Sequence, residues 1–204
     1  MTDIFPKIPR LPYDKYFMLH AALTATRSTC NRGPVQILDS SRCGVGAVIV
    51  KEHRIIASGY NGSPPGEPHC NEFRCSECKW VLKKDLSNSD EISQLALICP
   101  KCGEAVVGGH ILIDNHCIRT LHAEENALLQ CALDGVSPRK GTVYTTASPC
   151  WDCSKRLVRV GISRIVYAAE YDSRYRFNKE SYELLIRNNI QVNHINAVNL
   201  FHGE

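Results

Sequence analysis

Long hydrophobic runs are missing from this sequence of 204 residues, and no stretch approaches the roughly 20 apolar residues needed to cross a bilayer. Residues 1–12 contain three prolines and lack the hydrophobic core of a signal peptide, so we expect a cytoplasmic protein. The sequence also lacks a large excess of one sign of charge, because its net charge is only +3. This value is too small to suggest nucleic-acid binding. We therefore expect neither a membrane protein nor a nucleic-acid binder.

Cysteine, in contrast, is abundant: the chain has eleven, and its hydrophobic content of 44% is enough for one well-packed core. Many cysteines indicate either disulfides in an oxidising compartment or metal thiolates in a reducing one. The absence of an export signal and the recurrence of Cys-x-x-Cys pairs favour metal.

The hydrophobic pattern alternates between strand-like and helix-like segments. Helices are expected at residues 13–29, 120–133, 150–160 and 180–188, and strands at 44–50, 54–58, 141–146, 165–169 and 190–195. This alternation predicts a sheet with helices packed on both faces. We expect one domain over residues 1–204, carrying an insertion rich in Cys, Gly and Lys at 71–109.

The first chemical motif is His122-Ala-Glu124, followed by Pro149-Cys150-x-x-Cys153. One imidazole and two thiolates can hold a zinc ion and leave its fourth position open for water, as in catalytic sites. Glu124 is then free to move protons. The alternative is a core histidine, a surface glutamate and a buried cysteine pair. The ordered combination is typical of zinc-dependent nucleobase deaminases and favours the catalytic interpretation.

A second motif lies inside the expected insertion, where Cys75-x-x-Cys78 and Cys99-x-x-Cys102 form two pairs. This spacing predicts a zinc ribbon with four thiolates. Four ligands close a metal site, so the ion would be structural and would fold a segment with little core of its own. The alternatives are a chance pairing of cysteines or disulfides.

Taken with these motifs, the chain resembles the deoxycytidylate (dCMP) deaminases of the cytidine deaminase superfamily. It is also similar to the bacterial late-competence deaminase-like proteins around residues 114–120. The resemblance runs through residues 25–30, 45–49, 59–64, 122–127, 144–150, 170–172 and 184–192. It implies a three-layer α/β/α fold with a central mixed five-stranded sheet. It also implies deamination of dCMP to dUMP, a homohexamer, and control by dCTP and dTTP. Leu133 stands where some relatives have an arginine linked to that control, and the ribbon is not general in the family.

The resemblance also suggests substrate contacts. It implies that Asn61 contacts the deoxyribose, that Tyr171 lies over the nucleotide, and that Asn126 belongs to the site. Arg27 is the candidate for the phosphate, since a guanidinium matches phosphate geometry. The alternatives are turn chemistry for Asn61, structural support for Asn126 and a solvent-facing charge for Arg27.

Some relatives bind a second, non-catalytic zinc. Cys30, Cys70 and His116 match the positions of its ligands, and His110 stands where the late-competence relatives have a cysteine, at an acceptable zinc spacing from His116. These four residues predict a Cys2His2 set; the alternative is a buried cysteine with solvent-facing histidines. His69 and Cys117 are adjacent competitors for two of these places. Three zinc ions are therefore expected, one catalytic and two structural. Cys43 and Cys131 have no pair spacing and are expected to be small core residues.

Two other functions remain open. One is a different zinc deaminase, acting on dCTP, on a modified cytosine nucleotide or on tRNA adenosine. The other is a non-enzymatic zinc-binding module associated with DNA uptake. The small net charge speaks against tRNA, and the retained Glu124 speaks against a module without catalysis.

Overall fold

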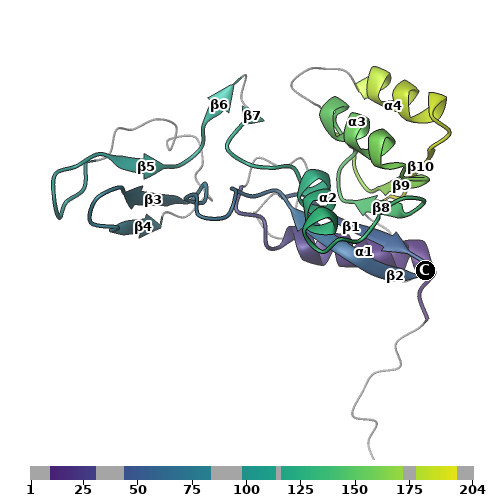
Figure 1. The fold of residues 1–204 in the computed structure, drawn as a ribbon, viewed down its shortest axis with the longest axis horizontal. Coiled ribbons are helices and arrows are strands. Elements are labelled where there is room, and N and C mark those ends of the chain that lie inside the picture. The colour runs from purple at the N-terminus through teal and green to yellow at the C-terminus, as the bar shows by residue number, and fades with distance from the viewer. Residues whose placement is uncertain (1–9, 31–43, 84–97, 114–115, 172–177, 197–204) are drawn as a thin grey trace, which may run out of the picture.

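The structure is a computed structural model that describes residues 10–30, 44–83, 98–113, 116–171 and 178–196. Within these ranges the chain forms a layered α/β body and an arm that extends from one side of it (Figure 1). In this described part, no helix combines the length and the apolar character needed to cross a membrane.

Five strands form the central sheet of the body, in the order β10-β9-β8-β1-β2. Their bounds are Gly46–Lys51 (β1), Arg54–Tyr60 (β2), Thr142–Thr145 (β8), Arg164–Tyr167 (β9) and Gln191–His194 (β10). β1 is antiparallel to both β2 and β8, whereas β8, β9 and β10 run parallel. The expected mixed five-stranded sheet is thereby confirmed.

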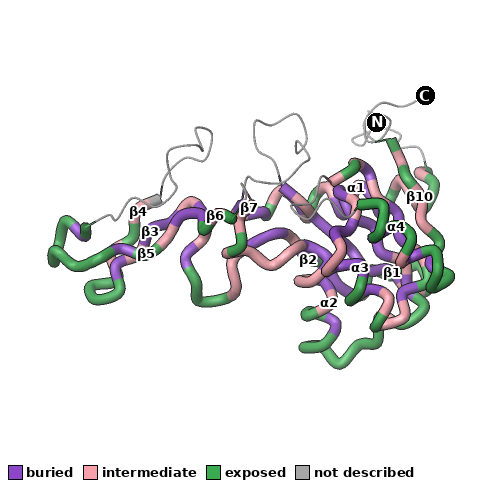
Figure 2. Tube along the Cα trace, turned by 90° about the horizontal axis from the view of Figure 1, so that it is seen from above, coloured by how far each residue is buried: buried purple, intermediate pink, exposed green. Residues whose placement is uncertain are grey.

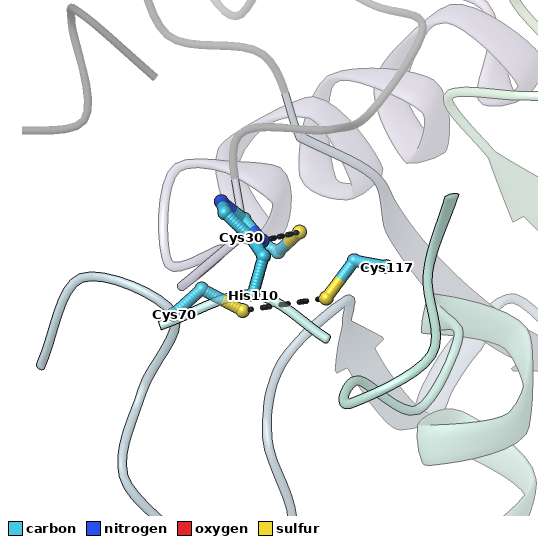
Figure 3. Close-up of side chains that lie close together, drawn as sticks. All are labelled: Cys30, Cys70, His110 and Cys117. Atoms are coloured by element: carbon cyan, nitrogen blue, oxygen red, sulfur yellow. Dashed lines mark hydrogen bonds between the residues drawn. The ribbon is translucent and has the colours of Figure 1, made fainter. Parts of the chain in front are cut away.

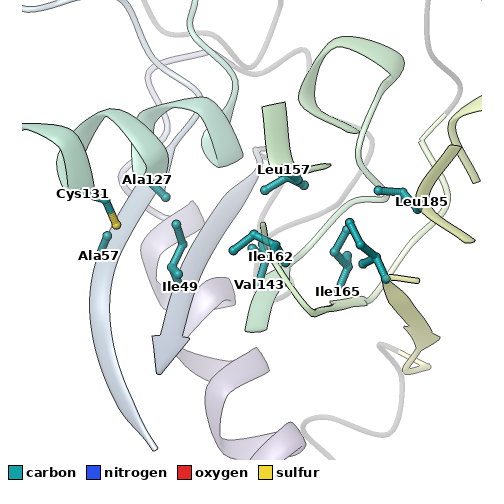
Figure 4. Close-up of a cluster of buried hydrophobic side chains, with 10 residues drawn as sticks. Ile49, Ala57, Ala127, Cys131, Val143, Leu157, Ile162, Ile165 and Leu185 are labelled. Carbon is teal, nitrogen blue, oxygen red and sulfur yellow. The ribbon is translucent and has the colours of Figure 1, made fainter. Parts of the chain in front are cut away.

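Helices cover both faces of this sheet. Their bounds are Tyr13–Ala25 (α1), Ala123–Leu133 (α2), Trp151–Val160 (α3) and Asn178–Arg187 (α4). Side chains on β1 alternate between the faces: Val48 packs with Phe17 and Met18 of α1, whereas Ile49 joins the cluster under the other three helices (Figure 4). The predicted three-layer arrangement is confirmed. Cys131 is buried in the second cluster, as expected for a core residue, while Cys43 lies outside the described residues.

Two helix boundaries differ from the prediction in ways that matter for the site. α1 ends at Ala25 rather than at residue 29, and the chain then turns so that the Thr29 amide donates to the Asn61 carbonyl at 3.3 Å. α2 begins at Ala123 rather than at residue 120, because His122 has extended dihedrals (φ −71°, ψ 156°). Cys30 and His122 therefore lie just outside the helices.

Gly59 on β2 lets α2 approach the sheet closely. A Cβ at this position would lie 2.3 Å from the Ala123 carbonyl oxygen and 2.4 Å from the Ala127 nitrogen. Any larger residue would therefore push away the first turn of α2. The position of His122 and Glu124 relative to the sheet depends on this contact.

The arm consists of the insertion and the residues that follow it. β3 (Glu72–Cys75), β4 (Val81–Lys83) and β5 (Val106–Gly108) form an antiparallel sheet of order β4-β3-β5. β6 (Leu112–Ile113) and β7 (His116–Cys117) form a short pair between this sheet and the body (Figure 1). The core of the arm is small, comprising Phe73, Val106 and two cysteines, and in Figure 2 short buried stretches of the arm alternate with exposed ones.

Candidate active site and metal centres

The catalytic motif comes together where two helices begin on the same face of the sheet. His122 immediately precedes α2, Cys150 immediately precedes α3, and Cys153 lies in the first turn of α3. Residues three apart on a helix share a face, so the two cysteine side chains point to one place. α3 directly follows β8 through a turn in which the Ser148 amide donates to the Ala169 carbonyl at 2.8 Å.

The three predicted ligands are close enough to share one ion. His122 Nδ1 lies 3.4 Å from Cys150 Sγ and 3.6 Å from Cys153 Sγ, and the three ligand atoms lie within 4.8 Å of one another. Tetrahedral zinc with bonds of about 2.0–2.3 Å requires ligand separations of about 3.5–3.8 Å. Both cysteines are free thiols and buried. The donor set therefore fits zinc and leaves one coordination position for a small molecule.

Glu124 stands beside these ligands without joining them. Its side chain is 4% exposed, and Cys153 Sγ donates to its Oε2 at 3.7 Å. Burial raises the pKa of the carboxyl to about 7. A carboxyl with a pKa near neutrality both accepts and donates a proton easily, as general acid–base catalysis requires.

The two thiols of the site share their charge unequally. The hydrogen bond from Cys153, together with the neighbouring His122, lowers the pKa of Cys150 to about 4. The same hydrogen bond raises the pKa of Cys153. One thiolate is therefore already stable next to the imidazole, which favours capture of a cation.

The four cysteines of the predicted ribbon also converge. Cys75 Sγ lies 3.4 Å from Cys102 Sγ, and Cys78 Sγ lies 3.5 Å from Cys99 Sγ. All four are free thiols whose sulfurs lie within 4.8 Å of one another. These separations suit tetrahedral thiolate coordination and are far too long for disulfide bonds.

The two halves of the ribbon have matching backbone geometry. In the first turn the Cys75 amide donates to the Trp80 carbonyl, and in the second the Cys99 amide donates to the Glu104 carbonyl, both at 2.8 Å. The residue after each pair, Lys79 or Gly103, has positive φ (57° and 77°). This repetition shows two equivalent turns that aim four sulfurs at one point.

A third cluster lies where the arm meets the body, and it corrects one predicted ligand. Its members are Cys30, Cys70, His110 and Cys117 (Figure 3). Cys30 Sγ lies 3.7 Å from His110 Nδ1, and Cys70 Sγ lies 3.7 Å from Cys117 Sγ.

The structure thus places Cys117 in the cluster, and not His116. Successive side chains of a strand point to opposite sides, so the strand that directs Cys117 into the cluster directs His116 away from it. His110 presents Nδ1 to the cluster, 3.7 Å from Cys30 Sγ, so its imidazole supplies one nitrogen ligand. The set is therefore three sulfurs and one imidazole.

Asn61 lies next to this cluster but has its amide oxygen fully engaged. Its Oδ1 accepts hydrogen bonds from Ser28 Oγ at 2.6 Å and from the Val45 amide at 2.7 Å, and its Nδ2 donates to the Cys30 carbonyl at 3.3 Å. Two donors fill both lone pairs of an amide oxygen, and the Nδ2 group makes one hydrogen bond within the described residues, so its second N–H has no partner among them. The φ of Asn61 is not positive, so left-handed turn chemistry does not explain this residue.

The other predicted substrate residues differ in their position. Asn126 Nδ2 donates to the Tyr60 carbonyl at 2.7 Å and so ties α2 to β2, which is the supporting role considered above. Arg27 is exposed after the end of α1. The Tyr171 ring lies 6.4 Å from the His122 ring between centroids, nearly perpendicular to it at 89°. Tyr171 therefore borders the catalytic cluster.

Comparisons with known proteins agree with this geometry. Residues 12–169 match the family described as the cytidine and deoxycytidylate deaminase zinc-binding region. The chain belongs to this family.

Among curated members of the family, the deoxycytidylate deaminase of Enterobacteria phage T4 is 36% identical over 169 residues, covering 76% of this chain and 81% of its own. The ComE operon protein 2 of Bacillus subtilis is 34% identical over 162 residues, covering 79% and 62%. The deoxycytidylate deaminase of Saccharomyces cerevisiae is 33% identical over 183 residues, covering 90% and 45%. The aligned region thus spans less than two thirds of the last two relatives.

A solved member shares the fold. The dCMP deaminase of the cyanophage S-TIM5, in complex with dCMP and dUMP, aligns with a TM-score of 0.59 at 23% identity, covering 92% of this chain and all of its own. At this identity the likeness concerns the fold.

For the third cluster, the sequence pattern predicts the wrong one of two adjacent residues: it selects His116, whereas Cys117 lies in the cluster. The sequence leaves Cys117 as a competitor of His116 for one ligand position, because both side chains are plausible zinc ligands. The two-residue strand that decides between them is too short to leave a period-two pattern in the sequence.

Proposed function

We propose that the chain catalyses the zinc-dependent hydrolytic deamination of dCMP to dUMP and ammonia, a source of dUMP for thymidylate synthesis. The observation that carries this proposal is the combination of three convergent ligands with a buried carboxyl that is not one of them. His122, Cys150 and Cys153 leave one position of a tetrahedral ion open, and Glu124 lies beside it.

His122, Cys150 and Cys153 would hold the zinc, which when bound would lower the pKa of a water molecule to about 7 and make it nucleophilic at neutral pH. Proton transfer is the work of Glu124. Its carboxylate takes a proton from the attacking water, delivers a proton to N3 of the cytosine ring, and assists the departure of the amino group from C4 as ammonia. A pKa of about 7 suits this alternation between base and acid.

The preference for a free deoxycytidine nucleotide is supported by the relatives. Deoxycytidylate deaminases of phage T4 and yeast are 36% and 33% identical to this chain, and the cyanophage enzyme was solved with dCMP and dUMP. The contact of the Tyr171 ring with His122 supports a role for Tyr171 in binding the nucleotide. Asn61 and Asn126 contribute by holding the loop after β2 and the start of α2. For Arg27, exposure is compatible with a phosphate contact.

We further propose three zinc ions per chain, one catalytic and two structural, within a single domain over residues 1–204 whose insertion spans 71–109. The support is the presence of three separate donor clusters with separations suited to zinc. Clusters of free thiols require a reducing compartment, so we place the protein in the cytoplasm.

The proposal also covers the oligomeric state of the protein and its regulation by nucleotides. We expect a homohexamer whose activity responds to dCTP and dTTP, as the family resemblance implies. Leu133 is 82% exposed at the end of α2, and it offers no charge to a nucleotide effector. The response to dCTP and dTTP should therefore be weak.

The proposal is tested by measuring ammonia release from dCMP, dCTP, deoxycytidine and cytosine-containing RNA, each with and without dCTP or dTTP as effector. Release that is fastest from dCMP supports it. Faster release from dCTP or from RNA would assign a different zinc deaminase, and no release from any substrate would favour a non-enzymatic zinc-binding protein.

A further inference from the structure

The short strand β7 separates two neighbouring side chains. Cys117 points into the cluster with Cys30, Cys70 and His110 (Figure 3). The ring of His116 lies instead against Tyr171, with 6.1 Å between ring centroids and an interplanar angle of 83°. The side chain of His116 is thus directed away from the metal cluster and toward Tyr171, which borders the catalytic cluster.

Tyr171 itself contacts two imidazoles. Its ring is edge-to-face with His116 and also with His122, the catalytic ligand, at 6.1 Å and 6.4 Å between centroids. Its backbone amide donates to Ser148 Oγ at 2.8 Å. The backbone is therefore fixed by the turn before α3, and the ring is restrained by the histidines.

We propose that His116 is a positioning residue that holds the Tyr171 ring at the edge of the catalytic cluster, where it packs against a bound nucleobase. This inference rests on the function proposed above. An edge-to-face pair of this kind adds a directional preference beyond the area that it buries, so it favours one orientation of the ring. A ring that is already oriented does not lose further freedom when the nucleotide binds.

The position of His116 is set by the joint between arm and body. β7 pairs with β6, with Ile113 opposite His116 and Leu112 opposite Cys117. Cys117 is the next residue and is held by the third cluster. The insertion and its metal site thereby influence the active site through two adjacent residues of one strand.

The experiment combines His116→Ala, His116→Phe, Tyr171→Ala and the double variant His116→Ala/Tyr171→Ala. The readouts are the Kd of dUMP by calorimetry, kcat and KM for dCMP, and zinc content per chain. His194→Ala is a matched control, because His194 packs against Tyr167 at 5.1 Å between ring centroids, in β10 and β9 of the central sheet.

We expect His116→Ala to weaken dUMP binding and to raise KM by about three- to tenfold, the range that such a ring contact can supply, with kcat less affected. His116→Phe should restore most of the affinity, because it keeps a ring in contact with Tyr171. The double variant should bind no worse than Tyr171→Ala alone, and zinc content should not change. The His194→Ala control should bind dUMP normally.

Three outcomes would overturn the inference while leaving the function intact: unchanged binding in His116→Ala, additive losses in the double variant, or the loss of one zinc ion from His116→Ala. Additive losses would show that His116 contacts the nucleotide itself. Loss of zinc would show that His116 is a ligand. If the wild-type chain binds dUMP but leaves dCMP unchanged, the proposed function fails and the binding cycle still decides the role of His116. If it neither binds dUMP nor deaminates dCMP, both are overturned.

Discussion

At the scale of single residues, the proposed chemistry depends on a carboxyl that the fold keeps buried beside the three proposed metal ligands. Glu124 is 4% exposed, and its only described side-chain hydrogen-bond partner is the Cys153 thiol at 3.7 Å. Glu125, the next residue, faces outward instead and pairs with Arg156 at 3.2 Å. Adjacent glutamates thus have different roles because a helix turns them to different sides.

Replacing Glu124 with Gln should lower kcat for dCMP by at least about 10²–10⁴-fold, the usual contribution of a general acid–base, because an amide cannot exchange protons. Catalytic zinc should stay bound, since Glu124 is not a ligand. Ammonia release and zinc content per chain measure the two effects. The control is Glu125→Gln, for which we expect almost normal activity. A zinc-loaded Glu124→Gln variant with normal turnover would refute the role given to Glu124.

At the scale of elements, a polar network joins α1 to the central sheet. Arg164 on β9 donates to both carboxylate oxygens of Asp14 at 2.6 Å and 2.7 Å, and the Tyr144 hydroxyl donates to Asp14 at 2.8 Å. The guanidinium hydrogen bonds hold the pKa of Asp14 below its ordinary value. The first turn of α1 is thereby fixed to β8 and β9 at once.

Asp14→Asn should destabilise the protein by about 1 kcal/mol at neutral pH, the upper end for a solvent-accessible pair. A carboxyl whose pKa is lower in the folded state stabilises the fold above its unfolded pKa of about 3.9, and this contribution is lost as the pH falls through the folded pKa. Chemical denaturation of both proteins between pH 7 and pH 3 should therefore show a difference that shrinks on acidification. A constant difference would contradict the charged pairing.

The arm is an element of a different kind, because its apolar core is too small to stabilise it alone. Besides its cysteines, the core consists of Phe73 and Val106, with Trp80 and Leu82 partly buried against them. We therefore expect metal coordination to supply most of the free energy that orders residues 72–83 and 98–108.

Cys99→Ser, which removes a buried ribbon sulfur, should lower the zinc content by one ion per chain and abolish protection from hydrogen exchange in β3, β4 and β5. The central sheet should keep its protection, since its two hydrophobic clusters do not include the ribbon. Exchange followed by mass spectrometry resolves the two regions. Unchanged protection in the arm would mean that the small apolar core is sufficient.

At the scale of the whole molecule, the third cluster joins parts that are distant in sequence. Cys30 follows α1, Cys70 precedes β3, His110 follows β5, and Cys117 ends β7. One metal ion at this point would connect the arm to the body on both sides of the insertion. The arm's orientation, and with it the position of β7, would then depend on metal.

Cys117→Ser should reduce zinc from three ions to two per chain and lower the thermal midpoint of unfolding, because it removes a ligand from this joint. Cys131→Ser is the control: this cysteine is also buried, but it lies in the core beneath α2, so the zinc content should stay at three. Metal analysis of the purified proteins gives the answer. Three ions in Cys117→Ser would show that His116 or another side chain can replace the lost sulfur.

The central fold and two of the three clusters were predictable from sequence because their signals are local. Alternating β-branched residues and apolar helical spacing identify all five strands and four helices of the body to within a few residues. Each Cys-x-x-Cys pair presents two sulfurs to one point through its own turn or helix, so the spacing alone predicts shared coordination. The catalytic set required only that two such local units meet.

The sequence by itself therefore determined the layered fold and indicated two sets of side chains that converge in the structure: His122, Cys150 and Cys153 with Glu124 beside them, and the four ribbon cysteines. Only the tertiary structure decided that Cys117 rather than His116 completes the third cluster, that Asn61 supports a loop through its amide oxygen, and that His116 packs against Tyr171. The role of Asn61 depends on the packing that brings Ser28 and Val45 to its amide oxygen. The other two outcomes depend on which face of the two-residue strand β7 meets Cys70 and which meets Tyr171. No local sequence pattern encodes the orientation of β7, because that orientation is set by the packing of the arm against the body.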